Sequence, residues 1–155
     1  MNINDYLIQQ QGHDWRALLS AWSWLLPENF TVWLVNRFGD IFLVTDDGSV
    51  HMLDAGGGSL TKLAESREDF AQKIDEGNNT NLWLMVPLVD SCVAAGITLK
   101  PGHCYGFKIP PSLSGAYSVE NCEVTDMSVH YELLGQIHEQ LRGVPDGTAV
   151  KVAIG

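Results

Sequence analysis

The sequence predicts an α+β fold with a mainly antiparallel sheet, which begins with a three-stranded meander and packs against about four to five helices. Three observations predict this class. The 155 residues fit one hydrophobic core. Segments with a period of two follow one another too closely for the crossovers that parallel strands require, and segments with helical spacing lie before and after them. We therefore expect residues 1–155 to form a single domain.

Two helices are expected before the first strand. The segment Asp5–Gln10 has Asn4 as a candidate cap. The segment Asp14–Leu26 has apolar residues at helical spacing and ends at Pro27. The residues of this apolar face are Trp15, Leu18, Leu19, Trp22, Leu25 and Leu26. Trp24 lies nearly opposite this face, so it either packs under another element or is an exposed aromatic of the kind that anchors interfaces.

Three short runs of β-branched and aromatic residues follow, and each predicts a strand. They are Thr31–Arg37, Ile41–Thr45 and Val50–Asp54. The connections between them are short, Phe38-Gly39-Asp40 and Asp46-Asp47-Gly48-Ser49, and an Asp-Gly pair is a strong hairpin signal. These runs therefore predict a three-stranded antiparallel meander.

The middle of the chain predicts a loop and two helices. Gly56-Gly57-Gly58 marks the loop, after which Ser66 can cap a helix that continues to Ile74. The next helix, about Leu82–Ala95, is apolar almost all round, so we expect it to be central to the fold. Pro87 should kink this helix or mark its first turn.

The last third of the chain predicts three strands and a long helix. Tyr105–Ile109 and Asn121–Thr125 are the first two strands. Asp126 can cap a helix over Met127–Arg142, which carries one apolar stripe. A Pro-Asp-Gly turn then predicts a final strand, Thr148–Ile154.

Composition limits the classes of partner. The chain holds 19 acidic residues against 9 Lys and Arg, a formal charge of −10, which repels nucleic-acid phosphates and anionic membranes. No signal peptide or membrane span is expected. Cys92, Cys104 and Cys122 are too widely spaced for a disulfide framework or a zinc motif, so we expect buried free thiols in a reducing cytoplasm.

The negative charge is concentrated in one segment. Residues 28–76 hold ten acidic and four basic residues, which favours either a solvated acidic face or a docking surface for a basic protein. We expect neither a nucleic-acid nor a membrane partner. Eight residues are therefore candidate partner contacts: Trp24, Asp40, Asp46, Asp47, Asp54, Glu65, Glu68 and Asp69.

No catalytic motif, metal-ligand pattern or cofactor motif stands out in the sequence. His130 lies in the middle of an apolar stripe, which indicates a satisfied core histidine. Two alternatives to a protein-binding module remain open. One is an enzyme that uses His51, His103 or His130 with nearby carboxylates. The other is a regulatory domain that binds a small ligand at the loop of Gly56, Gly57 and Gly58.

A set of short segments, spread over most of the chain, is specific when taken together. The segments are Trp22-Ser23-Trp24-Leu25-Leu26-Pro27, Asn36-Arg37-Phe38-Gly39-Asp40, residues 47–54, residues 104–111, Gly115, Asn121, Val129-His130-Tyr131 and residues 134–138. Together they resemble a bacterial domain family of unknown function, similar to the C-terminal domain of immunity proteins that protect bacteria from their own type VI secretion DNase effectors.

The resemblance implies a cytoplasmic protein that binds a cognate toxin, and it implies no catalytic residues. In such immunity proteins this domain often follows a GAD-like domain. We expect no separate GAD-like domain here, because the first matching segment begins only at Trp22. The resemblance and the acidic segment together predict a non-enzymatic module that occludes a basic effector, such as a nuclease, through its acidic surface.

Overall fold

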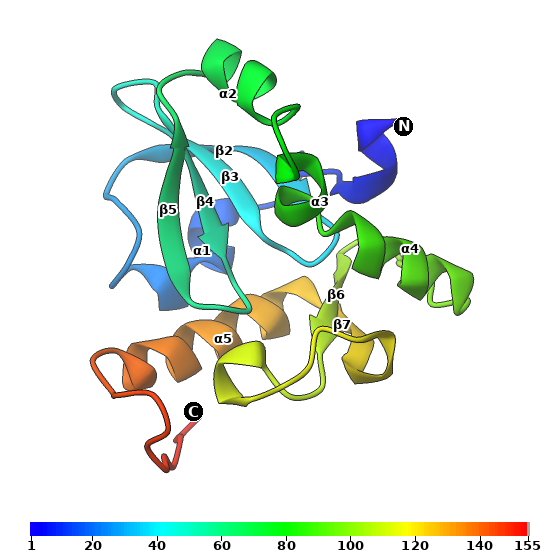
Figure 1. The fold of residues 1–155 in the computed structure, drawn as a ribbon. Helices are drawn as coiled ribbons and strands as arrows, with labels where there is room; N and C mark the ends of the chain where they lie inside the picture. Colours follow the sequence, from blue (N-terminus) through cyan, green and yellow to red (C-terminus); the bar gives the residue numbers. More distant parts are fainter. Residues whose placement is uncertain (155) are drawn as a thin grey trace.

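The structure is a computed structural model that describes residues 1–154. Its main element is a five-stranded antiparallel sheet in which each strand pairs with the next one in the sequence (Figure 1). The strands are β1 (Leu7–Ile8), β2 (Phe30–Asn36), β3 (Ile41–Thr45), β4 (Val50–Asp54) and β5 (Ser59–Ala64). A second antiparallel sheet consists of β6 (His103–Phe107) and β7 (Cys122–Asp126). The predicted α+β class with a mainly antiparallel sheet is confirmed.

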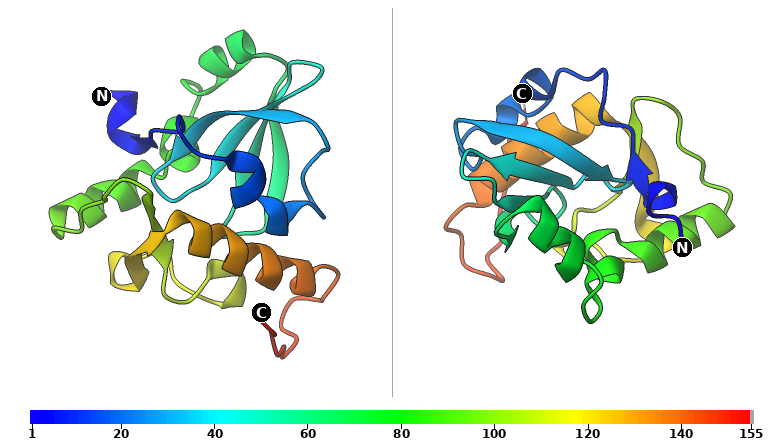
Figure 2. Two further views of the ribbon diagram at one scale, coloured as in Figure 1. Left: turned by 180° about the vertical axis from the view of Figure 1, so that it is seen from behind. Right: turned by 90° about the horizontal axis from the view of Figure 1, so that it is seen from above.

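The helices of residues 1–154 form two layers around the main sheet (Figures 1 and 2). The α-helices are α1 (Trp15–Leu18), α2 (Arg67–Lys73), α3 (Asn79–Trp83), α4 (Val86–Ala94) and α5 (Met127–Leu141). The short 3-10 helices are η1 (Ile3–Tyr6), η2 (Ser20–Trp22), η3 (Pro111–Leu113) and η4 (Val119–Asn121). Side chains alternate along β3: Ile41 and Leu43 pack with α5 and η2, whereas Phe42 packs with α2. The sheet therefore has an apolar core on each face.

The predicted meander is confirmed as β2, β3 and β4, with β2 shifted by one residue. Its register pairs Thr31 with Val44, and Ile41 with Leu53. The β3–β4 turn closes through a hydrogen bond from the Thr45 N–H to the Ser49 carbonyl. The Asp-Gly pair therefore acts as the hairpin signal that the sequence indicates.

Two strands of the sheet were not predicted. A helix was expected over Asp5–Gln10, but this expectation is wrong: η1 is capped by Asn2, and β1 then pairs Leu7 with Asn36. So short a segment gains little from helix formation, whereas the sheet offers β1 hydrogen bonds and an apolar neighbour. β5 follows the Gly56–Gly58 turn and pairs with β4, so the meander continues for one more strand.

The helix predicted over Asp14–Leu26 is broken into α1, η2 and a following turn. Its apolar face is confirmed, because Leu19 and Trp22 are buried and the other members pack against the same core. The Trp22 Nε1–H donates to the Tyr131 carbonyl of α5 at 2.9 Å. A Cβ at Gly135 would lie 2.7 Å from the Ala21 carbonyl oxygen. Close packing against α5 thus accompanies the tighter 3-10 turn.

The long helix predicted over Leu82–Ala95 is in fact two helices, α3 and α4. Met85 between them has a φ of +51°, and Pro87 lies in the first turn of α4. This segment is not central to the fold, because α4 projects at the edge of the molecule (Figures 1 and 2). Leu82 is 62% exposed and Val93 is 56% exposed. The apolar side chains therefore face both the core and the solvent.

Two of the three cap predictions are confirmed, and the third is wrong because Asn2, not Asn4, caps η1. The Ser66 side chain accepts a hydrogen bond from the Asp69 N–H at the start of α2. The Asp126 side chain accepts from Ser128 and Val129 at the start of α5. The final strand predicted over Thr148–Ile154 is wrong, because these residues form no strand. Gln140 of α5 instead binds the backbone of Ala153 through its side-chain amide, so this tail is held by a side chain rather than by a sheet.

Candidate functional site

The acidic residues singled out by the sequence gather at opposite ends of β4. Asp46, Asp47, Glu65, Glu68 and Asp69 lie at the end where the β3–β4 turn meets the start of α2, since Val50 pairs with Ala64. We call these five residues the acidic end. Asp40 and Asp54 lie at the other end of β3 and β4. The two groups are separated by the length of β4, roughly 13 Å for five residues.

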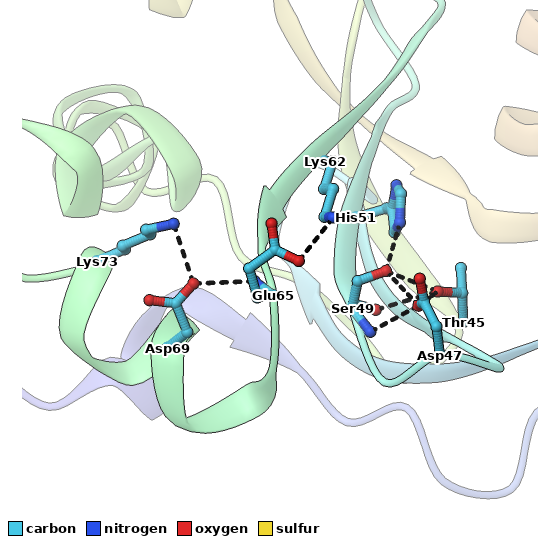
Figure 3. A network of polar contacts seen from close by, with 8 residues as sticks. All are labelled: Thr45, Asp47, Ser49, His51, Lys62, Glu65, Asp69 and Lys73. Atoms are coloured by element: carbon cyan, nitrogen blue, oxygen red, sulfur yellow. Dashed lines mark hydrogen bonds and ion pairs between the residues drawn. The ribbon is translucent and has the colours of Figure 1, made fainter.

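Asp47 organises the turn within the acidic end. It accepts hydrogen bonds from the Thr45 hydroxyl at 2.6 Å, and from the Ser49 hydroxyl at 2.6 Å and N–H at 3.0 Å (Figure 3). The hydrogen bonds from the Ser49 and Thr45 side chains hold the pKa of Asp47 well below its usual value. The Asp47 carboxylate therefore has a structural role in the turn. It also remains charged and exposed.

Two cations lie within the acidic end. Lys62 pairs with Glu65 at 2.8 Å, and Lys73 pairs with Asp69 at 2.9 Å (Figure 3). Asp69 also accepts the Glu65 N–H, and this backbone hydrogen bond, with the Lys73 pair, lowers the pKa of Asp69. Exposed pairs of this kind contribute little to stability. They do reduce the net negative charge that this surface presents.

Asp40 does not lie on the surface that the sequence suggested. Its side chain is 3% exposed, and it accepts hydrogen bonds from the Ala55 N–H at 2.9 Å and from the Asn36 amide at 3.0 Å. Burial, together with the neighbouring Asp54 carboxylate, raises the pKa of Asp40 to about 8. Asp40 therefore supports the end of the hairpin from inside the molecule.

The glycine loop is a closed turn rather than an open anion cradle. The Gly57 N–H donates to the Asp54 side chain at 2.9 Å, and the Gly58 N–H donates to the Asp54 carbonyl at 2.8 Å. Gly58 has a φ of +74°, and a Cβ there would lie 2.4 Å from the His138 Nδ1. Turn geometry and close packing against α5 thus account for these glycines. The Asp54 carboxylate also makes the loop unfavourable for an anion.

A cavity of about 680 Å³ opens beside Asp40 and Asp54. It lies between α3 and α4 on one side and the segment from Phe107 to Val119 on the other. Most of its lining is apolar, and the polar groups include Asp40, Asp54 and His130. No sequence pattern indicated this cavity, because its walls come from residues between 38 and 130. We call it the α4 cavity.

The three histidines of the enzyme hypothesis do not form one site. The His51 ring bonds with the Ser49 hydroxyl at 2.9 Å, and the His103 ring lies 3.1 Å from the Pro101 carbonyl. His130 is buried in α5, as predicted, but its Nε2 makes no hydrogen bond of ordinary geometry within residues 1–154. Burial lowers the pKa of His130 to about 4, so its ring is neutral near neutral pH. The core position is confirmed, and the ring has the Phe38 backbone as a polar neighbour, whose interaction offsets part of the effect of burial on the pKa of His130.

Trp24 is partly buried. It stacks on Trp22 with ring centroids 5.9 Å apart, and the Arg142 guanidinium lies 5.4 Å from its ring centre. Its Nε1 is buried and has no hydrogen-bond partner in the described part of the chain. Of the two interpretations of Trp24, packing against other elements matches this geometry better than a free interface anchor.

The cysteines are buried free thiols, as predicted. Burial raises the pKa of Cys104 above its usual value and that of Cys122 to about 12, so these thiols are poor nucleophiles. Among residues 1–154, no three His, Cys, Asp or Glu side chains gather closely enough to hold a metal ion. Over the same residues, none of the helices has the length and apolar character needed to cross a bilayer.

Comparison with known proteins shows a similarity over nearly half of the chain. Residues 64–138 match the family model described as T6SS immunity protein Tdi1, C-terminal. This match confirms the predicted resemblance to the C-terminal domain of type VI secretion immunity proteins. The matched segment runs from the end of β5 through most of α5. The earlier segments that carried the resemblance, between Trp22 and Asp54, lie outside it.

Among solved structures, the crystal structure of Atu4351 from Agrobacterium tumefaciens is similar to this chain. The two sequences are 20% identical, and the superposition has a TM-score of 0.48. It covers 78% of this chain and 60% of that one, so this chain spans less than two thirds of its length. A search of curated proteins finds no match.

Proposed function

We propose that this chain is an immunity protein that binds and neutralises a cognate type VI secretion toxin in the cytoplasm. The observation that carries the proposal is the match of residues 64–138 to the immunity family. The toxin that suits the charge of the chain is a nuclease. The DNA-binding surface of a nuclease must be basic, so an acidic protein can compete with DNA for that surface.

Neutralisation by binding needs no chemical step. The dispersed histidines and the poorly nucleophilic thiols support a non-enzymatic role. The ligand-loop alternative receives no support, because the Gly57 and Gly58 N–H groups already bond to Asp54. We therefore propose a basic protein as the partner, with no nucleic-acid or membrane ligand.

Co-expression tests the proposal directly. Each candidate toxin encoded beside this gene is induced in a sensitive host, with and without this chain, and growth is followed. We expect this chain to restore growth with one candidate, and the two proteins to purify together as a stable complex. A variant with Leu134→Asp, which places a charge in the core, is the unfolded control. The proposal is wrong if no neighbouring candidate gives either rescue or a complex.

A further inference from the structure

We propose that the α4 cavity receives an arginine or lysine side chain of the toxin. This inference rests on the proposed function, since it names the surface and the chemistry by which the partner is held. The cavity volume of about 680 Å³ falls in the range of ligand pockets, about 300 to 1,000 Å³. It is therefore large enough for a projecting loop or helix end that carries the cation.

The walls suit the aliphatic stem and the charged head of such a side chain. Apolar side chains that line the cavity include Phe38, Met52, Leu82, Met85, Leu88 and Phe107. Phe38 stacks on Phe107 with ring centroids 5.2 Å apart. Tyr117 makes a T-shaped contact with Phe107, with ring centroids 5.4 Å apart. Ring faces attract cations, and apolar walls cover the methylene groups of Lys and Arg.

The negative charge of the cavity comes from Asp54, which lies at the end of β4. Asp40, just before β3, also lines the cavity, and because its pKa is raised to about 8 it adds a second charge only when it loses its proton. Within the described residues, no Lys or Arg contributes to the lining. Asp54 is only partly buried, so its carboxylate is available to a partner, whereas Asp40 lies deeper. A low-dielectric cleft with this lining concentrates negative potential and favours a cation.

A second observation also indicates a ligand. His130 lines the same cavity and is 6% exposed, and its ring interacts with the Phe38 backbone, yet its buried Nε2 makes no contact that meets hydrogen-bond distance and angle. Buried polar groups in proteins are almost always paired, and an unpaired one at a cavity calls for an explanation. Because the neutral ring carries no positive charge, it does not oppose an incoming cation.

The position of the cavity points to a protein as the source of the cation. Most of its lining belongs to the segment 64–138 that matches the immunity family. The chain carries a formal charge of −10, which draws a basic protein surface toward it. A buried cation in an aromatic-lined pocket is also the form that energetic hot spots take at protein interfaces.

The first test removes the charge of Asp54 alone. Asp54→Asn keeps an oxygen that can accept the Gly57 N–H, so the turn is preserved. The matched control, Glu123→Gln, removes one charge from an exposed position of β7 outside the cavity lining. Binding to the nuclease-inactive toxin is measured by calorimetry, with dissociation rates from surface plasmon resonance. We expect Asp54→Asn to weaken binding by roughly ten-fold or more through faster dissociation, and Glu123→Gln by less than about two-fold.

The second test places a cation at the rim of the cavity. Leu82 lines the cavity and is 62% exposed, whereas Val93 is 56% exposed and lies outside the lining. Both accept an arginine without loss of core packing. We expect Leu82→Arg to weaken toxin binding by roughly ten-fold or more and to lose protection of growth. Val93→Arg should bind as the wild type does.

The outcomes separate this inference from the proposed function. Melting temperatures are measured first, and Leu82→Arg decides the test if Asp54→Asn fails to fold. If the wild-type chain binds the toxin and the folded cavity variants bind it equally tightly, the cavity assignment is wrong and the immunity role stands. If the wild-type chain binds no toxin, the proposed function fails and the cavity assignment fails with it.

Discussion

The carboxyl group of Asp40 lies beside that of Asp54 at the end of the β3–β4 pair, where Ile41 is paired with Leu53. Two acidic side chains on neighbouring strands repel each other, and burial adds to the cost of charging the deeper one. Asp40 is that deeper group. The pair therefore couples the stability of the hairpin end to pH.

The first prediction concerns stability between pH 6.5 and 8. The folded protein keeps a proton on Asp40 up to a pKa of about 8, whereas an unfolded aspartate loses it near pH 4. The folded state thus binds more protons in this range, so the free energy of unfolding falls as pH rises, by up to ~1.4 kcal/mol per pH unit. Urea unfolding should show this slope in the wild type and in the exposed control Asp46→Asn, and lose it in Asp40→Asn. Equal slopes in all three proteins would contradict the prediction.

The second prediction concerns the acid side. Burial lowers the pKa of His130 to about 4, whereas an unfolded histidine binds its proton near pH 6.5. The unfolded state therefore binds more protons between these values, so His130 reduces stability as pH falls from 6.5 toward 4. In this range Asp40 acts in the opposite direction.

The variant His130→Gln isolates that contribution. We expect its free energy of unfolding to fall less steeply from pH 6.5 to 4.5 than that of the wild type, as measured by urea unfolding. His138, whose pKa is also lowered by burial, and Asp40 act in both proteins, so the difference between the two slopes belongs to His130. If His130→Gln showed the wild-type slope, the neutral buried ring would not be the cause.

The third prediction concerns the glycine loop. Gly58→Ala places a methyl group against the His138 ring at a φ of +74°, whereas Gly48→Ala has a similar φ of +84° and nothing within 4 Å. Both variants carry the conformational cost, and only the first carries the clash. We expect Gly58→Ala to be less stable than Gly48→Ala by about 1–3 kcal/mol in thermal or urea unfolding. Equal losses of stability in the two variants would show that the His138 ring moves aside at little cost, which would contradict the prediction.

The fourth prediction concerns the acidic end. Reversing two exposed charges there, Asp46→Lys with Glu68→Lys, should slow association with the toxin by roughly ten-fold at low salt. The double variant Glu132→Lys with Glu139→Lys makes the same charge change on exposed positions of α5. Stopped-flow association rates compare the two. A similar slowing in both variants would indicate an effect of net charge rather than of this surface.

The sequence predicts well those features that neighbouring residues determine. Ser66 and Asp126 bond to N–H groups within three residues, so their helices begin where the sequence indicates. The Asp-Gly turn is local in the same sense. β1 and β5 depend instead on pairing with β2 and β4, and neither carries a strong pattern of its own. Strand pairing in the folded protein therefore determines the conformation of these two segments, which local propensity does not.

The candidate site shows the same division. The acidic residues are visible in the sequence, but it does not reveal that β4 separates Asp54 from the acidic end or that Asp40 is buried. The α4 cavity is lined by residues from both α3 and α4, which Met85 separates by its left-handed conformation, and composition alone does not indicate this break. Its walls come from distant segments, so no local pattern could predict it.

The five-stranded sheet has a consequence for the segment that matches the immunity family. That segment, residues 64–138, supplies Phe70 and Tyr131 but lacks β1 to β4 and all of β5 except Ala64. The missing β3 carries Phe42 and Leu43, the core neighbours of Phe70 and Tyr131. Expressed as an isolated fragment, it would expose two apolar faces to solvent and become a substrate for chaperones and proteases. The segment that matches the family is thus smaller than the unit that folds. The matched segment depends on the N-terminal strands as a scaffold for its core.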